Sequence, residues 1–492
     1  MIFLPILISA LVGVVLLASS LLDHLKGRKR GSRALHAIVG VTLSLSSIGA
    51  VVTSWTSVGS ITLFTLFESI PVCFGADELG RVFVLVTSIV WTAIGFYSFR
   101  YMKHEGNEKT FYGFYLLVYA VLVALDLSGN LITMYFFYEL MTITSMPLIL
   151  HSRTRESIMA ALKYLFYSMA GAYLALFGIF VLYRYCDTLA FVAGGSLNTV
   201  SAMENQKLLL AVVFLMLLGF GAKAGMFPLH AWLPTAHPAA PAPASAALSA
   251  IVVKCGVLAV IRLVYYVVGA DFIRGTWVQR AWLWLALLTV FMGSMLAYRE
   301  KVFKKRLAYS TVSQLSYILF GLALFTPQGF TGAILQVVGH AFAKCALFMT
   351  AGIFILRTGK TRVEDYEGIG KRMGITLFAY TIASLSLIGI PPTIGFVTKW
   401  YLAQGSLAAE LGVLSIAGPV ILLISALLTA GYLLPVTMRG FYPGEGNPTC
   451  KEKERPDMMC IMLVLMAFLS FVLGMFPGSI IEYTQSFLTA LM

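Results

Sequence analysis

The feature that most limits the possible folds of this chain is a series of apolar stretches of about 20 residues, which recur from one end to the other. A helix of that length crosses a hydrocarbon core about 30 Å thick. Only 12% of the 492 residues are charged, which is roughly half the share found in soluble domains, and the mean hydropathy is +0.86. We therefore expect an all-α polytopic membrane protein.

The apolar stretches predict about fourteen transmembrane helices. The first is expected to be a retained helix, because no basic residue precedes it and the basic run KGRKRGSR (26–33) follows it, the reverse of a secretory signal. The predicted spans are 2–22, 35–56, 79–99, 111–128, 130–150, 158–183, 207–230, 243–266, 281–298, 306–325, 331–356, 375–402, 412–438 and 458–477.

The distribution of basic residues predicts the orientation of these spans. Most of the 35 Lys and Arg residues lie in the loops after the odd-numbered spans, and few lie in the others. The positive-inside rule then places the odd loops in the cytoplasm and both termini outside the cell membrane. The net charge of +13 therefore reflects topology and does not predict a nucleic-acid partner.

The chain shows no pattern typical of a redox cofactor or a metal. Its six cysteines are scattered without a CxxC spacing, and an iron–sulfur cluster needs clustered thiolates. The seven histidines have no metal-ligand spacing, and no glycine-rich phosphate loop follows a predicted strand. We expect the chain to bind neither a cofactor nor a metal by itself.

Residues 58–78 differ from the apolar spans. They alternate apolar and hydroxyl residues and contain no Lys or Arg. This pattern predicts an extracytoplasmic hairpin or a short pair of strands between the second and third spans.

Two of the predicted spans are interrupted by proline. The stretch GFGAKAGMFPLHAWLPTAHPAAPAPA (219–244) follows an apolar run and contains five prolines, the first at Pro228; the span at 375–402 contains IGIPPT (388–393). Proline removes a helical hydrogen bond that lipid cannot replace, so the freed carbonyls must face protein or a water-filled cavity. Paired broken helices in two halves are typical of ion pathways in transporter-like folds.

The broken spans are the seventh and the twelfth, and an odd separation of five spans reverses the direction across the bilayer. Spans 4–8 and 9–13 are therefore predicted to be inverted five-helix repeats. The expected domains are helices 1–3 (1–110), the first repeat (111–266), the second repeat (281–441) and a C-terminal helix (442–492).

Several ionisable residues lie deep inside predicted spans. Lys223, Lys254 and Lys344 are about 10 to 16 residues from a span end, too far for the ammonium to reach the surface easily. Lys399 lies beside the second proline break. A charge at the membrane centre costs from about 2.5 to over 10 kcal/mol, so these lysines are predicted to be functional.

Three other ionisable residues have simpler interpretations. Lys163 lies about one turn from the cytoplasmic end of its span, where snorkelling and function are equally good explanations. Arg262 is expected to be an anchor near the outer boundary, and Asp126, which closes the fourth span, is expected at the interface.

Glu139 and His340 complete the predicted site. Burial favours the neutral form of an amine and a nearby carboxylate favours the charged form, so a lysine near a movable Glu139 is poised to take up or release a proton. His340 lies one turn from Lys344 on the same helix face, and an imidazole both donates and accepts. The alternatives are a structural Glu–Lys pair and a packed histidine.

Four stretches resemble a known family. The chain is similar to the antiporter-like, proton-translocating membrane subunits shared by respiratory complex I, Mrp-type cation/proton antiporters and membrane-bound energy-converting hydrogenases. The resemblance covers most of 75–440 and is carried by FFYELMTITSMPL (136–148), GAKAGMFPLHAWLPTAHPAAP (221–241), KKRLAYSTVSQLSYILFG (304–321) with GAILQVVGHAFAKCALF (332–348), and SLIGIPPTIGFVTKW (386–400).

The resemblance implies a set of roles for these residues. It implies fourteen helices with inverted repeats, a buried pair of Glu139 and Lys223, and an exit-side group at Lys399, where some members carry glutamate. It also implies central proton-carrying groups at Lys254, His340 and Lys344. It implies other antiporter-like and small membrane subunits as partners. GADELGRVF (75–83) stands in place of a common aspartate, and Asp77 and Glu78 receive no role.

The leading hypothesis is a non-redox, proton-translocating subunit of a multisubunit membrane complex. Whether that complex is an oxidoreductase or an Mrp-type antiporter, and whether Na+ moves as well, stay open at this point. A stand-alone transporter for a small solute is the alternative, and it predicts a polar pocket at the breaks lined by Asn, Gln or Ser. A structural scaffold is the second alternative.

Overall fold

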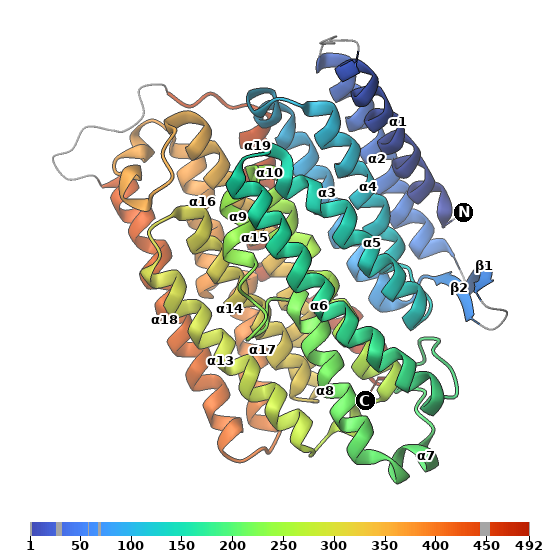
Figure 1. Cartoon of the computed structure of the whole chain (residues 1–492). Helices are drawn as coiled ribbons and strands as arrows, with labels where there is room; N and C mark the ends of the chain where they lie inside the picture. The colour runs from blue at the N-terminus through green and yellow to red at the C-terminus, as the bar shows by residue number, and fades with distance from the viewer. Residues whose placement is uncertain (1, 26–31, 58, 67–69, 443–452, 492) are drawn as a thin grey trace.

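The structure, a computed structural model, describes residues 2–25, 32–57, 59–66, 70–442 and 453–491. Most of the long helices lie side by side and run between the same two ends of the bundle (Figure 1). The α-helices, in chain order, are α1 Phe3–Leu25, α2 Ser32–Thr56, α3 Glu78–Glu105, α4 Glu108–Asp126, α5 Leu131–Ile149, α6 Arg155–Tyr185, α7 Thr199–Glu204, α8 Gln206–Lys223, α9 Leu233–Ala239, α10 Ala242–Ala247, α11 Lys254–Ile261, α12 Ala270–Ile273, α13 Trp277–Arg299, α14 Phe303–Ala323, α15 Pro327–Thr358, α16 Gly374–Ile388, α17 Ile394–Ala408, α18 Val413–Phe441, α19 Met458–Met475 and α20 Gly478–Leu488.

Shorter helical turns complete the described chain. Two π-helical segments, Leu248–Val252 and Arg262–Val268, flank α11 and join it to α10 in one long rod. The 3₁₀ turns are Leu150–Ser152, Val363–Tyr366 and Ile369–Lys371. π-Helical turns inside a rod shift the side chains that follow them, and they are frequent at functional sites.

Every predicted span overlaps a helix of the structure. Within the described residues, twelve helices are long and apolar enough to cross a membrane. The remaining two predicted spans correspond to α14, whose first turn holds three basic residues, and to the broken pair α16 and α17. The all-α polytopic architecture and both broken helices are confirmed, whereas the number fourteen stays a prediction.

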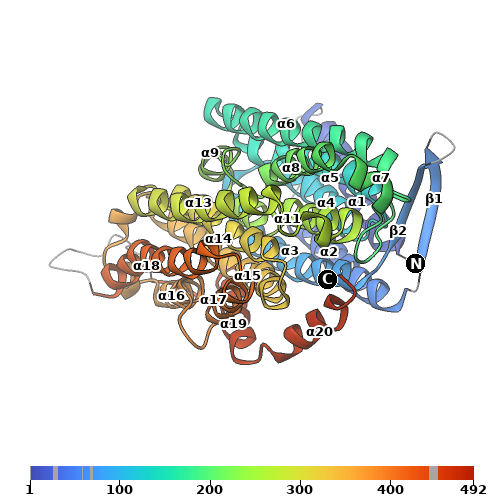
Figure 2. The same cartoon turned by 90° about the horizontal axis from the view of Figure 1, so that it is seen from below.

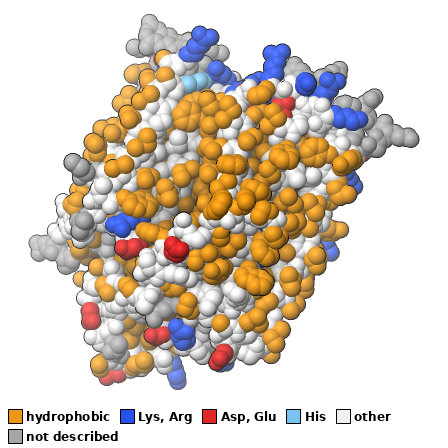
Figure 3. Space-filling model, turned by 180° about the vertical axis from the view of Figure 1, so that it is seen from behind, with side chains coloured by type: hydrophobic (Ala, Val, Ile, Leu, Met, Phe, Trp, Pro, Cys, Tyr) orange, Lys and Arg blue, Asp and Glu red, His pale blue; other side chains and the backbone are white. Residues whose placement is uncertain are grey.

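The outer surface of the bundle is apolar. Figure 3 shows hydrophobic side chains covering the middle of one face, with most of the visible Lys and Arg side chains toward its upper end. Large side chains on several helices stand well out of the protein, including Phe166 and Phe180 on α6, both 69% exposed, and Leu427 on α18, 74% exposed. Such a surface is stable in contact with lipid hydrocarbon.

A β-hairpin lies at the end of the bundle where α1 begins. Strands β1 (Ser60–Leu66) and β2 (Ile70–Gly75) pair antiparallel and project from the lower right of Figure 1. The amide of Gly75 donates to the carbonyl of Leu127 at 2.9 Å, which ties the hairpin to the end of α4. The predicted strand pair is confirmed.

The first broken helix ends at Lys223, five residues before Pro228. Gly225 adopts a left-handed conformation with φ +74°, and the amide of Met226 donates to the carbonyl of Gly221 at 2.9 Å. This pattern is a Schellman end, in which glycine at the left-handed position lets the chain turn back. The carbonyl of Ala222 accepts from the amide of Gly225 at 3.2 Å and also from the indole nitrogen of Trp232 at 2.9 Å.

The second broken helix ends in a similar way. Gly389 has φ +91°, and the amide of Ile390 donates to the carbonyl of Leu385 at 3.0 Å, before the chain resumes as α17. A proline pair, Pro391 and Pro392, follows the glycine as Pro228 follows Gly225. Each broken helix therefore ends on a left-handed glycine ahead of proline, and a carbonyl of its last turn accepts from a side chain, Ala222 from Trp232 and Leu387 from Lys399.

The two halves of the bundle also pair their helices alike. Helix α6 packs along α8 in the first half, as α15 packs along α17 in the second. Two glycines allow the first contact: a Cβ on Gly171 would lie 2.5 Å from the carbonyl oxygen of Gly219, and a Cβ on Gly219 would lie 2.4 Å from that of Gly171. This similarity supports the inverted repeats, whose boundaries at 111–266 and 281–441 stay a prediction.

Candidate functional site

Lys223 is the last residue of α8, where the first broken helix ends. Its side chain is fully buried, and Nζ donates to Oγ1 of Thr142 on α5. The same hydroxyl donates to the carbonyl of Tyr138 at 3.3 Å. The ammonium also lies 4.4 Å from the centre of the Tyr138 ring, so its partners are a hydroxyl and an aromatic face.

Glu139 is the nearest acidic group to Lys223, but the two are not in direct contact. Within the described residues no ion pair joins them, and Oε1 of Glu139 is buried without a hydrogen-bond partner. The two side chains still interact electrostatically. Glu139 is half-buried, since it lies on α5 beside the exposed Phe136 and Ile143. Glu139 and Lys223, which the resemblance implies to be a pair, thus interact without a direct contact.

Lys254 and His340 form the centre of the site. Nζ of Lys254, at the start of α11, lies 3.1 Å from Nδ1 of His340 on α15 and also donates to the carbonyl of Ala250. Their exposures are 2% and 1%. Lys254 therefore contacts an imidazole and a helix carbonyl, deep inside the bundle.

Lys344 lies one turn after His340 on α15 and is fully buried. Its ammonium is directed to the neighbouring helix α14, where it donates to Oγ of Ser310 and, at 2.9 Å, to the carbonyl of Leu307. Oγ of Ser310 donates to the same carbonyl at 2.9 Å. The predicted common face of His340 and Lys344 is confirmed, although each side chain has its own partners.

Lys399 lies on α17, after the second break. Its Nζ reaches back to donate to the carbonyl of Leu387 at the end of α16, at 2.7 Å, and lies 5.4 Å from the centre of the Tyr317 ring. A Cβ on Gly389 would lie 2.9 Å from Nζ and Cδ of Lys399, so glycine leaves the space that the lysine occupies. The carbonyl end of a helix is a favourable place for a cation.

The helices that carry the six predicted residues follow one another across the bundle. Viewed along the bundle in Figure 2, α5 and α8 lie on one side, α11 and α15 in the middle and α17 on the other side. The two ends of the row, Glu139 and Lys399, are half-buried, whereas the middle is sealed. The structure brings Lys254 and His340 into contact, and the other four side chains lie apart from one another.

Two buried basic residues were missed by the sequence interpretation. Lys304, expected in a loop, is 7% exposed in the first turn of α14, and its Nζ donates to the carbonyl of Ala240 at 2.6 Å. His237 on α9 is fully buried, and neither ring nitrogen has a hydrogen-bond partner among the described residues. His237 interacts electrostatically with Lys304 and Lys344. Its place in the proline-rich stretch after the first break was the available signal.

Arg262 is not the surface anchor that the sequence suggested. It is 2% exposed and forms an ion pair with Asp77, with Nη2 2.7 Å from Oδ1. Asp77 also caps α3 by accepting from the amide of Gly80. Burial opposes ionisation of Asp77, but the attraction and hydrogen bonds of Arg262 outweigh it and hold the pKa of the Asp77 carboxyl below its usual value.

Asp126 and Lys163 were also expected near the ends of predicted spans. Asp126, expected at the interface, is buried with 2% exposure, because α3 covers the end of α4. Lys163 is half-buried, and its Nζ donates to Oγ1 of Thr235 on α9 at 3.0 Å. Lys163 therefore contacts the segment that follows the first break.

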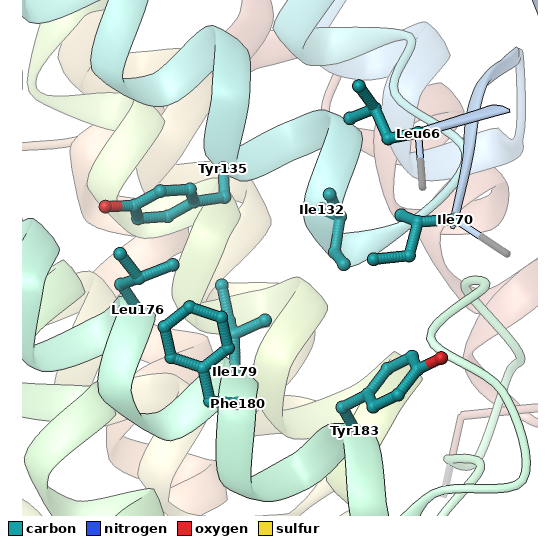
Figure 4. A pocket seen from close by; sticks show the side chains of 8 residues that line it. All are labelled: Leu66, Ile70, Ile132, Tyr135, Leu176, Ile179, Phe180 and Tyr183. Carbon is teal, nitrogen blue, oxygen red and sulfur yellow. The ribbon is translucent and has the colours of Figure 1, made fainter. Parts of the chain in front are cut away.

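A wide apolar groove of about 440 Å³ lies outside this row, between α5, α6 and the hairpin. Figure 4 shows its lining, which consists of Leu66, Ile70, Ile132, Tyr135, Leu176, Ile179, Phe180 and Tyr183. None of these side chains is an amide, an acid or an amine. No residue of either helix break lines this groove, and its apolar lining is suited to hydrocarbon.

Fold and site together define a class: a polytopic membrane protein with paired broken helices and a row of buried ionisable side chains, which is the antiporter-like class. Residues 128–426 match the family described as "NADH:quinone oxidoreductase/Mrp antiporter, TM", which is more than half of the chain. The chain belongs to this family.

Three relatives represent different branches of the family. The chain is 33% identical to the N-type subunit of NADH-quinone oxidoreductase from Desulforudis audaxviator, over 82% of both chains. It is 32% identical to the D-type subunit of the Na(+)/H(+) antiporter from Bacillus subtilis, over 92% of this chain and 89% of the relative. It is 31% identical to hydrogenase-4 component B of Escherichia coli, over 83% of this chain and 63% of the relative.

Solved structures share the fold over the whole chain. A chain of the Mrp complex from Dietzia sp. DQ12-45-1b matches with a TM-score of 0.83 and 21% identity, over 99% of this chain and 97% of that one. A chain of respiratory complex I from Thermus thermophilus matches with a TM-score of 0.79 and 22% identity, over all of both chains. These comparisons favour an antiporter-like subunit over a stand-alone solute transporter.

Proposed function

We propose that this antiporter-like subunit moves protons across the cell membrane along the row Glu139, Lys223, Lys254, His340, Lys344 and Lys399. The helices that carry the row follow one another across the bundle (Figure 2), and Lys223 and Lys399 lie on the two broken helices. Each member of the row is a group that exists in two protonation states, and its four lysines hydrogen-bond to hydroxyls, carbonyls and the imidazole of His340.

One observation carries this proposal: the central amines are buried without carboxylate partners. Lys223, Lys254 and Lys344 are 0%, 2% and 0% exposed, and within the described residues none of them forms an ion pair. A buried charge without a counter-charge costs several kcal/mol. A scaffold has no use for three such groups, whereas a proton path needs amines that can give up their charge.

The ends of the row are the places where neighbouring subunits would dock. Glu139 and Lys399 are half-buried, and around them the exposed side chains are apolar, such as Phe136 on one side and Phe396 on the other. The names of the relatives place them in Na(+)/H(+) antiporters, in NADH-quinone oxidoreductase and in a hydrogenase. We therefore infer other antiporter-like and small membrane subunits as partners, in the same membrane.

The orientation follows from the basic loops. Most Lys and Arg residues belong to the loops after odd-numbered spans, at the upper end in Figure 1. That end is proposed to face the cytoplasm, with both termini and the β-hairpin on the outer side.

The test is proton movement by the complete complex that contains this chain, purified with its subunits and reconstituted in lipid vesicles. Lys223→Ala is expected to lower the initial rate of proton transfer about tenfold or more while the complex stays assembled. Lys301→Ala is the matched control, because this lysine is 62% exposed and its ion pair is with Glu364 on the surface. Normal proton transfer by an assembled Lys223→Ala complex would support the scaffold instead.

The same vesicles test Na+ exchange, which the name of the Bacillus subtilis relative suggests. Uptake of radioactive Na+ that is driven by an imposed pH difference is measured with the unmodified complex. Uptake that disappears in Lys223→Ala assigns cation exchange to this row, and vesicles that move protons without Na+ assign proton transfer alone.

A further inference from the structure

Asp126 is a buried carboxyl group that lies outside the row. It is the last residue of α4 and is 2% exposed. The hydroxyl of Thr87 on α3 donates to its Oδ2 at 2.9 Å. A carboxylate has about four acceptor positions, so this group has room for a further donor such as water.

A small cavity connects Asp126 to the centre of the row. The cavity has a volume of about 10 Å³ for the centre of a water molecule, which is close to the space that one water needs. It is lined by Phe83, Val86, Thr87, Asp126, Ile251, Lys254, Cys255 and Val337. Asp126 and Lys254 are its only acid and amine, so a water held there has a carboxyl and an amine as partners.

The main chain of Asp126 also lies beside a polar cluster at the hairpin end. Gly80 marks the meeting point: a Cβ there would lie 2.7 Å from the main-chain oxygen of Asp126, 2.9 Å from Oδ1 of Asp77 and 3.6 Å from Nη2 of Arg262. Arg262 also interacts electrostatically with the carboxylate of Asp126. The side chain of Asp77 is 32% exposed, so this polar cluster reaches the protein surface.

We propose that Asp126 is a further proton-carrying residue, which exchanges a proton with Lys254 through the shared cavity. It would connect the row to the protein surface beside the β-hairpin. The proposal rests on the proposed function of the row. Arg262 lies eight residues after Lys254, about 12 Å along the rod, so Asp77, Arg262 and Asp126 bridge the distance between the central amine and the surface.

The transfer is balanced without any other reactant. Protonated Asp126 gives its proton to the water in the cavity, and that water gives another proton to the neutral amine of Lys254. The O–H bond of the carboxyl breaks and an N–H bond forms, which leaves a carboxylate and an ammonium. Arg262 stays charged throughout, since a guanidinium does not deprotonate, and its positive charge stabilises the carboxylate product.

The charged and titratable groups around Asp126 come from four segments. They are Asp77 before α3, Tyr119 on α4, Lys254 and Cys255 on α11, and Arg262 on the π-helical turn. Only Lys254 shares both the cavity with Asp126 and a contact with the next member of the row, His340.

The test uses the complete reconstituted complex and the variant Asp126→Asn, which keeps the size of the side chain. Its proton-transfer rate is expected to fall about tenfold, whereas Asp126→Glu keeps a substantial part of it. Asp271→Asn is the matched control, because this aspartate on α12 is 86% exposed and pairs with Arg274 on the surface. A normal rate in Asp126→Asn overturns the proposal.

Lys254→Met separates this proposal from the proposed function. If Lys254→Met stops transfer while Asp126→Asn is normal, the row stands and the role of Asp126 fails. If Lys254→Met is itself normal, the row fails, and Asp126 with it. A loss in both variants supports both proposals.

Infrared difference spectroscopy keeps the test decisive if Asp126→Asn does not assemble. During turnover the unmodified complex is expected to show a carboxylic-acid C=O band that Thr87→Val shifts, because this variant removes only the hydroxyl that donates to Asp126. Turnover spectra in which Thr87→Val shifts no carboxylic-acid band would overturn the role of Asp126.

Discussion

Nζ of Lys254 on α11 and Nδ1 of His340 on α15 lie 3.1 Å apart, so two basic groups share one hydrogen bond. An ammonium has no lone pair, and a doubly protonated imidazole has none either, so only one of the two partners supplies the hydrogen. Nε2 of His340 is buried without a partner among the described residues. The pair therefore carries at most one positive charge.

Replacing Lys254 by arginine separates charge from titration. Arginine keeps the positive charge but does not release its proton, so Lys254→Arg is expected to lose proton transfer about as fully as Lys254→Met, by tenfold or more. Proton transfer by the two variants is measured in reconstituted vesicles, with Lys301→Arg as the control. Activity retained in Lys254→Arg would mean that the site needs only a cation.

Adding a methyl group at Gly389 is expected to displace Lys399. The left-handed backbone, with φ +91°, costs about 1 kcal/mol or more for alanine, and the new Cβ would lie 2.9 Å from Nζ of Lys399. Gly389→Ala should therefore slow proton transfer and lower the melting temperature in detergent. Gly374→Ala is the control, because a Cβ there meets no atom within 4 Å. Equal rates in the two variants would contradict the position of Lys399.

Enlarging Gly219 is expected to separate α8 from α6. A Cβ at this position would lie 2.4 Å from the carbonyl oxygen of Gly171, and neither backbone can move without shifting the end of α8 at Lys223. Gly219→Val should cost about 1–3 kcal/mol, and it is followed by thermal unfolding in detergent. Gly478→Ala, where a Cβ meets nothing within 4 Å, should leave the melting temperature unchanged.

The ion pair of Asp77 and Arg262 predicts a pH-dependent stability. The pKa of Asp77 is lowered in the folded protein, so its contribution is fully present above the ordinary value of 3.8 and is lost as the pH falls through the lower folded value. Asp77→Asn should destabilise the protein by about 2 kcal/mol at pH 7, less than a fully buried pair because Asp77 is 32% exposed.

The measurement is the melting temperature of both proteins in detergent at pH 7 and near pH 3. The difference between unmodified protein and Asp77→Asn should be large at pH 7 and should shrink at the lower pH. Asp271→Asn, whose carboxylate is 86% exposed, should show no difference at either pH. A gap for Asp77→Asn that is independent of pH would contradict the ion pair.

The helices and both breaks were predictable because each depends on local sequence. A transmembrane helix must satisfy its own backbone and must be apolar, and glycine ahead of proline ends it. The sequence placed the first break near Pro228, and the helix ends at Lys223, since the Schellman turn needs the residues between them. The burial of the central lysines was predictable from depth alone.

Contacts between distant residues were not predictable in this way. Asp77 and Arg262 are 185 positions apart, and their pairing depends on the packing of α3 against the end of the rod that contains α11. Counting positions along one helix placed Arg262 and Asp126 at the boundary, but the first turn of α3 covers them. Lys304 was assigned to a loop because its helix begins three residues before the predicted span.

The hydroxyl partners of Lys223 and Lys344 have a consequence for the energy of each proton transfer. Thr142 and Ser310 each accept from an ammonium while donating to a carbonyl of their own helix. Once the amine is neutral, rotation about a single C–O bond turns the same hydroxyl toward the nitrogen lone pair. Each lysine can therefore hydrogen-bond to the same hydroxyl as an ammonium and as a neutral amine. The change between the two states needs only rotation of that hydroxyl, and no movement of the helices.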